Sequence, residues 1–203
     1  MKGVEFLQRF PQLLAFGAST GGPQAVETIL GLMRRPLRQA VFVIQHMPLG
    51  FTDPFAKRLQ RTLELDVREC VIDGDVVVEG VVYVARSGRH LTLRKTPRGL
   101  QTRFSDLPET ALHKPSIDVF LSSLALLLPD VTVRAAILTG MGHDGALGLR
   151  ELRDKGGITA VQAELDCVVY GMPKAALAQH GATDALTLQE LSAWASQGDS
   201  SNR

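Results

Sequence analysis

The sequence predicts an α/β fold: a doubly wound, mostly parallel sheet with helices on both faces and a β-hairpin insertion. Short apolar runs rich in β-branched residues alternate with segments whose apolar residues recur at helical spacing. This alternation is expected of parallel strands that helices cover on both faces. A middle segment instead alternates polar and apolar residues on either side of Pro97 and Gly99, which is typical of a hairpin.

The first half of the chain is expected to run strand, helix, strand, helix, over residues 13–18, 22–35, 40–47 and 52–65. Both strands are short, continuous apolar runs, and both helices carry apolar residues at helical spacing. The second helix opens with a start pattern in which Thr52 or Asp53 is the N-cap and Pro54 lies in the first turn.

From residue 81 to residue 104, a strand is expected to lead into the hairpin. Helices are then expected at 114–128, 143–157, 173–181 and 187–196, with strands at 131–140 and 158–163. The last helix begins with a capping box formed by Thr187 and Glu190. Because no repeat or linker interrupts the series, we expect residues 1–203 to form one domain with a core from about 13 to 197.

The charges of the chain nearly balance, because 22 Lys and Arg residues stand against 21 Asp and Glu residues. We therefore expect no nucleic-acid partner. Neither the two cysteines nor the histidines have the spacing of metal ligands, so we expect no metal and no organic cofactor. The sequence shows no signal peptide and no apolar run long enough to span a bilayer, so we expect a cytoplasmic protein without direct membrane insertion.

Three of the expected strands end in residues that carry chemistry. GASTGG follows the first strand, QHMP follows the second, and TGMGHDGA follows a later one. Open α/β sheets bind ligands at the carboxyl ends of their strands, so Ser19, His46 and Asp144 are candidates for one site. A serine, a histidine and an aspartate are the nucleophile, the general base and the orienting carboxylate that acyl transfer needs.

Ser19 lies in GASTG, residues 17–21, which matches the G-x-S-x-G pattern. A turn between a strand and a helix is the setting that this pattern requires, and free N–H groups at the start of the helix suit a developing oxyanion. The pattern alone leaves open that Ser19 merely caps the following helix. A phosphate-binding loop is less favoured, because neither G-K-[ST] nor G-x-G-x-x-G spacing is present.

His46 is favoured among the five histidines because it ends an apolar strand. His180 lies near a helix end and is interpreted as a partner of the helix dipole. We interpret His90, beside the hairpin, as a rim residue. His113 could line a cleft or cap a loop, and His143 is expected to point away from the site.

Asp144 stands between glycines at the start of a helix, in GMGHDGA. An N-cap aspartate is the alternative interpretation, although the glycines are more than a simple cap needs. Asp118 and Asp53 are the rival carboxylates, and both are expected in the first turn of a helix.

With these segments identified, the chain resembles the catalytic domain of the chemotaxis protein-glutamate methylesterase (CheB) family. The matching segments are GASTGGP, QHMPLGFT, HKPSIDVF, ILTGMGHDGA and CVVYGMPKAA, in the family's order from about residue 13 to residue 180. The resemblance implies a doubly wound parallel sheet and a triad at Ser19, His46 and Asp144. In the mechanism that we expect, backbone N–H groups near Thr20 and Met141 bind the oxyanion.

The resemblance also implies a substrate: glutamate γ-methyl esters on the cytoplasmic helices of methyl-accepting chemotaxis receptors, with deamidation of receptor glutamines as a second reaction. A serine esterase or amidase for another substrate, or a non-catalytic module that binds receptors or regulators, is the alternative. The family's receiver domain is expected to be absent, because only about a dozen residues precede the first strand. Regulation would then have to come from a separate partner, from expression or from substrate access. Ala163 and Asp166 depart from the family's pattern, which commonly has an acidic and a small polar residue at these positions.

Overall fold

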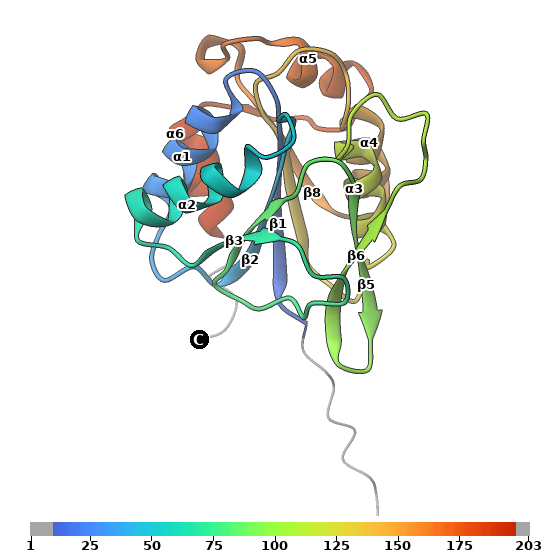
Figure 1. Ribbon diagram of the computed structural model, residues 1–203. Helices are drawn as coiled ribbons and strands as arrows, with labels where there is room; N and C mark the ends of the chain where they lie inside the picture. Colours follow the sequence, from blue (N-terminus) through green and yellow to red (C-terminus); the bar gives the residue numbers. More distant parts are fainter. Residues whose placement is uncertain (1–9, 198–203) are drawn as a thin grey trace, which may run out of the picture.

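The computed structural model of the protein describes residues 10–197 and confirms the predicted fold class (Figure 1). Seven strands form one sheet in the order β3-β4-β2-β1-β7-β8-β9, and each neighbouring pair is parallel. The strand order reverses at β1, which has β2 on one side and β7 on the other. The strands are β1 (Gln12–Ala18), β2 (Gln39–Gln45), β3 (Val67–Cys70), β4 (Val82–Ala85), β7 (Val133–Ile137), β8 (Ile158–Gln162) and β9 (Ala185–Leu186).

The middle of the chain forms the predicted hairpin. Strands β5 (His90–Thr96) and β6 (Gly99–Ser105) pair antiparallel in a separate two-stranded sheet. Leu91, Leu93 and Leu100 of the hairpin are buried in the same hydrophobic cluster as the helix that begins at Ile117. The hairpin therefore helps to cover one face of the large sheet.

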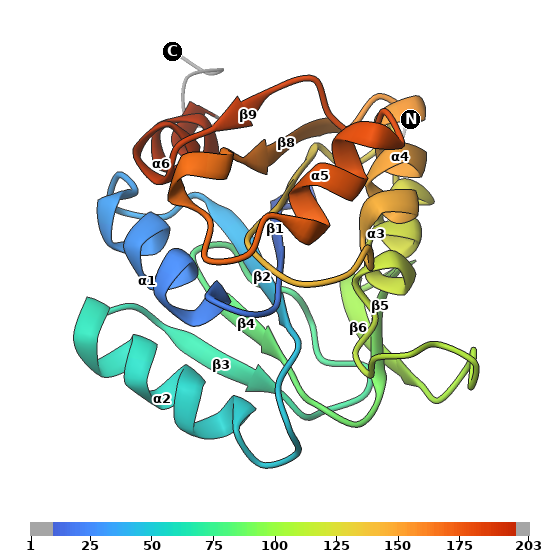
Figure 2. The ribbon, with the colours of Figure 1, turned by 90° about the horizontal axis from the view of Figure 1, so that it is seen from above.

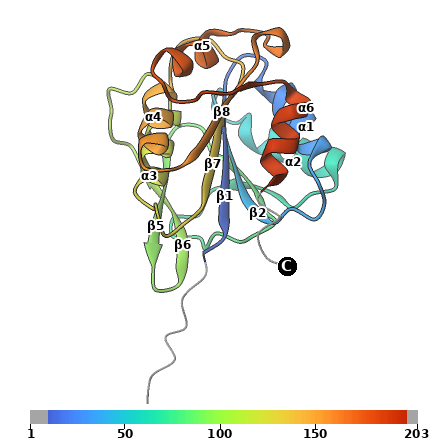
Figure 3. The same ribbon diagram turned by 180° about the vertical axis from the view of Figure 1, so that it is seen from behind.

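Helices cover both faces of the large sheet, as Figure 2 shows from above. Helices α1, α2 and α6 lie on one face, and α3, α4 and α5 share the other with the hairpin. Seen from behind, α6 lies beside α1 (Figure 3). The helices are α1 (Gly22–Leu32), α2 (Thr52–Leu63), α3 (Ile117–Ala125), α4 (Ala146–Asp154), α5 (Gly171–Ala178) and α6 (Leu188–Ala195), with a short 3-10 helix, η1 (Glu164–Asp166).

Alternate residues of the central strands enter two separate hydrophobic layers. In β1, Leu14 and Phe16 pack with the helices of one face, whereas Leu13 and Ala15 pack on the other. All four side chains are at most 1% exposed. Because each strand is buried on both faces, it reads as a continuous apolar run, which is why the sequence reveals these strands clearly.

The structure corrects the predicted start of α2. Neither Thr52 nor Asp53 is its N-cap, because the helix begins after Phe51 and has no side-chain cap. Thr52 is buried, and its hydroxyl instead donates to Glu69 of β3. The capping box of Thr187 and Glu190 at the start of α6 is confirmed.

Two further differences concern the strands. The edge strands β3 and β9 were not expected, since they have only four and two residues. β2 ends at Gln45 and β7 at Ile137, earlier than their apolar patterns suggest, so His46 and Thr139 lie in loops. None of the helices between residues 10 and 197 is both long and apolar enough to cross a membrane.

Candidate active site

The three chemistry-bearing segments meet where the strand order of the large sheet reverses. Ser19 follows β1, His46 follows β2, and Asp144 lies in the segment that connects β7 to α4. These are the carboxyl ends of neighbouring parallel strands, which lie at one edge of the sheet. The topology therefore brings to one place residues that lie far apart in the sequence.

The Ser19 turn is fixed by backbone contacts on both sides. The Ser19 N–H donates to the Thr139 carbonyl (3.1 Å), and the Ser19 carbonyl accepts from the Gly22 N–H (2.9 Å). Gly140 has to lack a side chain, because a Cβ there would lie 2.8 Å from the Ser19 Cβ. Gly21, not Ser19, is the N-cap of α1, and no side chain caps that helix. The alternative of Ser19 as a cap is therefore not what the structure shows.

Gln45 links Ser19 and His46, and it was not among the residues predicted from the sequence. Its side-chain N–H donates to the carbonyls of both Ser19 (2.8 Å) and His46 (3.1 Å), and only 1% of the residue is exposed. A polar residue at the end of an otherwise apolar run, next to a candidate base, was the available signal. Gln45 thus holds the backbone at the residues that the sequence predicts as nucleophile and base.

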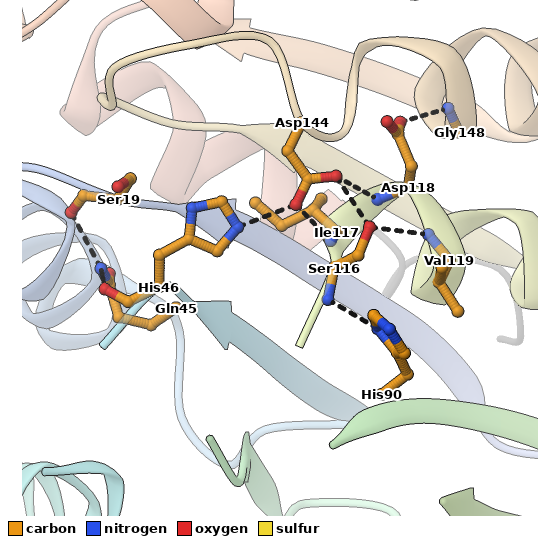
Figure 4. A network of polar contacts seen from close by, with 10 residues as sticks. All are labelled: Ser19, Gln45, His46, His90, Ser116, Ile117, Asp118, Val119, Asp144 and Gly148. Atoms are coloured by element: carbon orange, nitrogen blue, oxygen red, sulfur yellow. Dashed lines mark hydrogen bonds and ion pairs between the residues drawn. The ribbon is translucent and has the colours of Figure 1, made fainter. Parts of the chain in front are cut away.

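His46 and Asp144 are in direct contact. The Nε2–H of His46 donates to Oδ2 of Asp144 at 2.8 Å, and both side chains are largely buried. The other ring nitrogen, Nδ1, is buried and has no hydrogen-bond partner among the described residues. Ser19 lies on the opposite side of the imidazole from Asp144 (Figure 4). Since a carboxylate only accepts hydrogen bonds, the contact with Asp144 leaves Nδ1 of the neutral ring as an acceptor.

Four donors surround the Asp144 carboxylate. Besides His46, the N–H of Ile117 (2.8 Å), the N–H of Asp118 (3.0 Å) and the hydroxyl of Ser116 (2.9 Å) donate to it. We call the residues Ser116–Asp118 the carboxylate cradle. Burial by itself raises the pKa of Asp144, but the hydrogen bonds from His46 and the cradle outweigh it and hold the pKa below its ordinary value. Asp144 therefore stays ionised beside the imidazole.

Asp144 does cap a helix, although not the one that the sequence suggests. Helix α4 has Gly145 as its N-cap and no side-chain cap, whereas the Asp144 carboxylate takes two N–H groups at the start of α3. The start of a helix favours negative charge, which adds to the stabilisation of the carboxylate. Gly145 has a φ of 94°, and a Cβ there would lie 2.5 Å from the Ile137 Cδ1. The glycine thus permits the close turn that holds Asp144.

The rival carboxylates have other partners. Asp118 accepts from the Gly148 N–H (2.7 Å), and its pKa is raised by burial and by the nearby charge of Asp144. Asp53 pairs with Lys57 at 2.8 Å on the surface of α2. Both lie in the first turn of a helix, as expected. Of the two, Asp118 adjoins the candidate site, because its N–H donates to Asp144, and its carboxylate accepts from α4.

Two other histidines surround the site more closely than expected. His113 stacks on His46, with ring centroids 4.0 Å apart, and burial lowers the pKa of His113. The prediction that His90 is a rim residue is wrong, because His90 is 0% exposed and burial lowers its pKa. His143 and His180 are exposed. The carbonyl of His180 accepts from Arg153 (2.7 Å).

The two residues expected to bind the oxyanion lie in the loops on either side of Ser19. Thr20 is the next residue in the chain, and Met141 follows Gly140, whose backbone abuts Ser19. No acceptor for the N–H of Thr20 or Met141 is found within residues 10–197. The Met141 side chain is 74% exposed. Two free N–H groups beside the serine are the kind of donors that stabilise a tetrahedral oxyanion.

Asp166, one of the two departures from the family's pattern, has a structural partner. Its carboxylate accepts from the Leu188 N–H (2.7 Å) at the start of α6, and its carbonyl accepts from Gln162 (2.7 Å). It therefore links the loop after β8 to the last helix. The structure shows no comparable role for the small side chain of Ala163.

Two cavities flank the site. One of about 370 Å³ lies beside Asp144 and His113, and one of about 390 Å³ lies beside the loop that follows His46. The second is lined by Leu49, Val71, Arg86, Ser87, Gly88, Arg89 and Phe104. In the described part of the chain, no group of three or more His, Cys, Asp or Glu residues is arranged to hold a metal ion.

Comparisons with known proteins identify the family of the chain. The family model for CheB methylesterase matches residues 14–194. A protein-glutamate methylesterase/protein-glutamine glutaminase of Yersinia pestis bv. Antiqua is 41% identical over 181 residues, which is 89% of this chain and 51% of that protein. A protein of the same name from Geobacillus kaustophilus is 41% identical over 166 residues, which is 81% of this chain and 47% of that protein. The chain thus spans about half the length of these relatives.

A solved structure shows the same fold. The crystal structure of the Thermotoga maritima CheB methylesterase catalytic domain superposes with a TM-score of 0.86 at 31% sequence identity, covering 92% of this chain and 98% of that one. The chain belongs to the CheB methylesterase family.

Proposed function

We propose that this protein is a serine hydrolase that removes methyl groups from glutamate γ-methyl esters on the cytoplasmic helices of methyl-accepting chemotaxis receptors. The observation that carries the proposal is the arrangement of His46. Its Nε2–H is held by an ionised carboxylate, and its Nδ1 is buried, unpartnered and on the side of Ser19 (Figure 4). An imidazole held in this orientation, with one nitrogen free to accept a proton, can act as the base for a serine nucleophile.

In the proposed reaction, the Ser19 hydroxyl attacks the ester carbonyl while Nδ1 of His46 takes the hydroxyl proton. Asp144 stabilises the imidazolium that forms and keeps the ring in orientation. The N–H groups of Thr20 and Met141 bind the oxyanion of the tetrahedral intermediate. His46 then protonates the departing methanol, and water hydrolyses the acyl-enzyme by the same steps in reverse order.

Deamidation of receptor glutamines is a second proposed reaction at the same triad. It differs only in the leaving group, because ammonia departs from the same acyl carbon. The names of the relatives from Yersinia pestis and Geobacillus kaustophilus include both activities. A hydrolase for another ester remains the second candidate, since the triad acts on the acyl group and the surrounding loops select the substrate.

Methanol release from methylated receptor tests the proposal. Wild-type protein should release methanol, and Ser19→Ala should lose this activity while remaining folded. Ser122→Ala is a matched control, because Ser122 lies on α3 and its side chain has no hydrogen bond within the described residues. Normal release by Ser19→Ala would refute the triad. Reaction with a fluorophosphonate but no methanol release would indicate a different ester, and failure of both would indicate a non-catalytic module.

A further inference from the structure

His90 occupies a buried position behind the carboxylate cradle. It is the first residue of β5 and is 0% exposed. Its Nδ1 accepts from the Ser116 N–H at 3.1 Å, and its Nε2 donates to the Pro108 carbonyl at 3.3 Å. A backbone N–H only donates and a carbonyl only accepts, so these two contacts select the neutral ring with its proton on Nε2.

Ser116 is the residue through which His90 reaches the site. It is the N-cap of α3, and its hydroxyl donates to Asp144 while accepting from Val119 (3.3 Å). Ile117 and Asp118 follow directly and donate the other two cradle bonds. Because the three donors are consecutive in the chain, a displacement of the Ser116 backbone moves all of them relative to the carboxylate. Figure 4 shows the whole series from His90 to His46.

The two hydrogen bonds of His90 are not equivalent. Pro108 lies in an exposed loop, so water can replace the imidazole at its carbonyl. Ser116 is only 5% exposed, and its N–H has no other acceptor within residues 10–197. A buried N–H without an acceptor is strongly unfavourable, and the chain relieves it by shifting or by admitting water. The acceptor at Nδ1 is therefore the property of His90 that matters.

We propose that His90 is a positioning residue for the triad: its Nδ1 anchors the Ser116 N–H and thereby holds the carboxylate cradle in place around Asp144. This inference rests on the proposed function for its effect on the reaction, and on the hydrogen bonds of Ser116 and the cradle for its effect on Asp144. The hydrogen bonds of His90 go to Pro108 and Ser116 and not to Ser19 or His46, so it acts through the cradle.

Two variants of His90, each of which keeps one of its two hydrogen-bonding groups, separate this role from simple packing. His90→Asn keeps an acceptor near the position of Nδ1 and loses the donor to Pro108. His90→Gln keeps a donor near the position of Nε2 and loses the acceptor for Ser116. Ser123→Ala is the matched stability control, because the Ser123 hydroxyl accepts from the Leu93 N–H (3.3 Å) between α3 and β5, away from the cradle.

The first readout is the ¹H NMR resonance of the proton between His46 and Asp144, which needs no activity. The second is the rate at which a fluorophosphonate labels the purified protein. His90→Asn and Ser123→Ala should keep the resonance and stay within about threefold of the wild-type labelling rate. His90→Gln should lose the resonance and label about 10–100-fold more slowly, the range found for residues that orient metal ligands from behind.

Equal behaviour of His90→Asn and His90→Gln in both readouts would overturn the proposal. If His90→Gln does not fold, His90→Asn decides alone: a retained resonance supports the proposal, and a lost one overturns it. If the wild-type protein neither reacts with the fluorophosphonate nor releases methanol, the proposed function fails. The NMR comparison still decides whether His90 positions Asp144.

Discussion

Replacing Asp144 by asparagine tests the electrostatic centre of the site with almost no change of shape. The amide presents one acceptor and one NH₂ group where the carboxylate accepts four hydrogen bonds. If the NH₂ group takes the place of Oδ2, the imidazole has to accept at Nε2 and carry its proton on Nδ1, where it can no longer accept from Ser19, and the Ile117 N–H loses its acceptor. If it takes the place of Oδ1, the Ser116 hydroxyl can rotate, but the Asp118 N–H loses its acceptor.

The size of each effect follows from the hydrogen bond that is lost or from the tautomer that forms. One buried N–H without a partner lowers the free energy of unfolding by about 1–3 kcal/mol. The wrong imidazole tautomer lowers kcat by about 10⁴-fold in another serine-hydrolase triad, which corresponds to about 5 kcal/mol of activation free energy. We therefore expect Asp144→Asn to fold with moderately reduced stability and to lose nearly all hydrolysis.

The assay is the initial rate of methanol release, with urea unfolding measured on the same preparation. Asp118→Asn is the matched control, since its amide oxygen can still accept from Gly148 and the cradle N–H is unchanged. It should stay within a few-fold of wild type. A folded Asp144→Asn variant that keeps more than about a tenth of the wild-type rate would refute the role of the carboxylate, because a misoriented imidazole predicts a far larger loss.

Three further outcomes are expected. His46→Ala should lower kcat on the order of 10⁶-fold, as loss of the histidine does in another triad. The kcat of His113→Phe should stay within about tenfold of wild type, because an aromatic ring still stacks on His46. If a methanol-release assay gave the reverse order, His113 would be the base. Gly140→Ala should lose most of its activity and about 1–3 kcal/mol of stability, because its Cβ would lie 2.3 Å from the Met172 Sδ and 2.8 Å from the Ser19 Cβ. Gly31→Ala should retain activity, because the nearest atom to its Cβ would be 3.5 Å away. The free energy of unfolding, measured in urea, should fall as the pH falls below 6.5, because burial lowers the pKa of His90 in the folded protein and the unfolded chain therefore binds a proton more readily. His90→Asn should make this fall smaller. An unchanged pH dependence in the variant would contradict the burial of a neutral imidazole.

Local sequence patterns predicted much of the fold because the same residues that define the pattern also form the structure. The apolar runs of β1 and β2 are buried on both faces, and the capping box of α6 is closed by residues three apart. Predictions failed where a partner distant in sequence competes with a local one. Thr52 could cap α2 but donates to Glu69 instead, and this preference depends on packing against β3.

The candidate site shows the same difference between local patterns, which the sequence reveals, and contacts with residues distant in sequence, which it does not. G-x-S-x-G and the ends of the apolar strands were enough to select Ser19, His46 and Asp144. The contacts around them depend on tertiary packing between α3 and the loop after β7, so no local pattern reveals that Asp144 caps α3. The burial of His90 has the same cause, because it becomes evident only once the hairpin lies beside the start of α3.

Locating the covalent adduct of a fluorophosphonate by tandem mass spectrometry is the most direct test of Ser19 as the nucleophile. The geometry predicts a single adduct on Ser19, absent from Ser19→Ala and formed far more slowly by His46→Ala, because the hydroxyl then has no base at Nδ1. An adduct on another residue, or methanol release by a protein that is fully labelled elsewhere and unmodified at Ser19, would contradict the proposed triad.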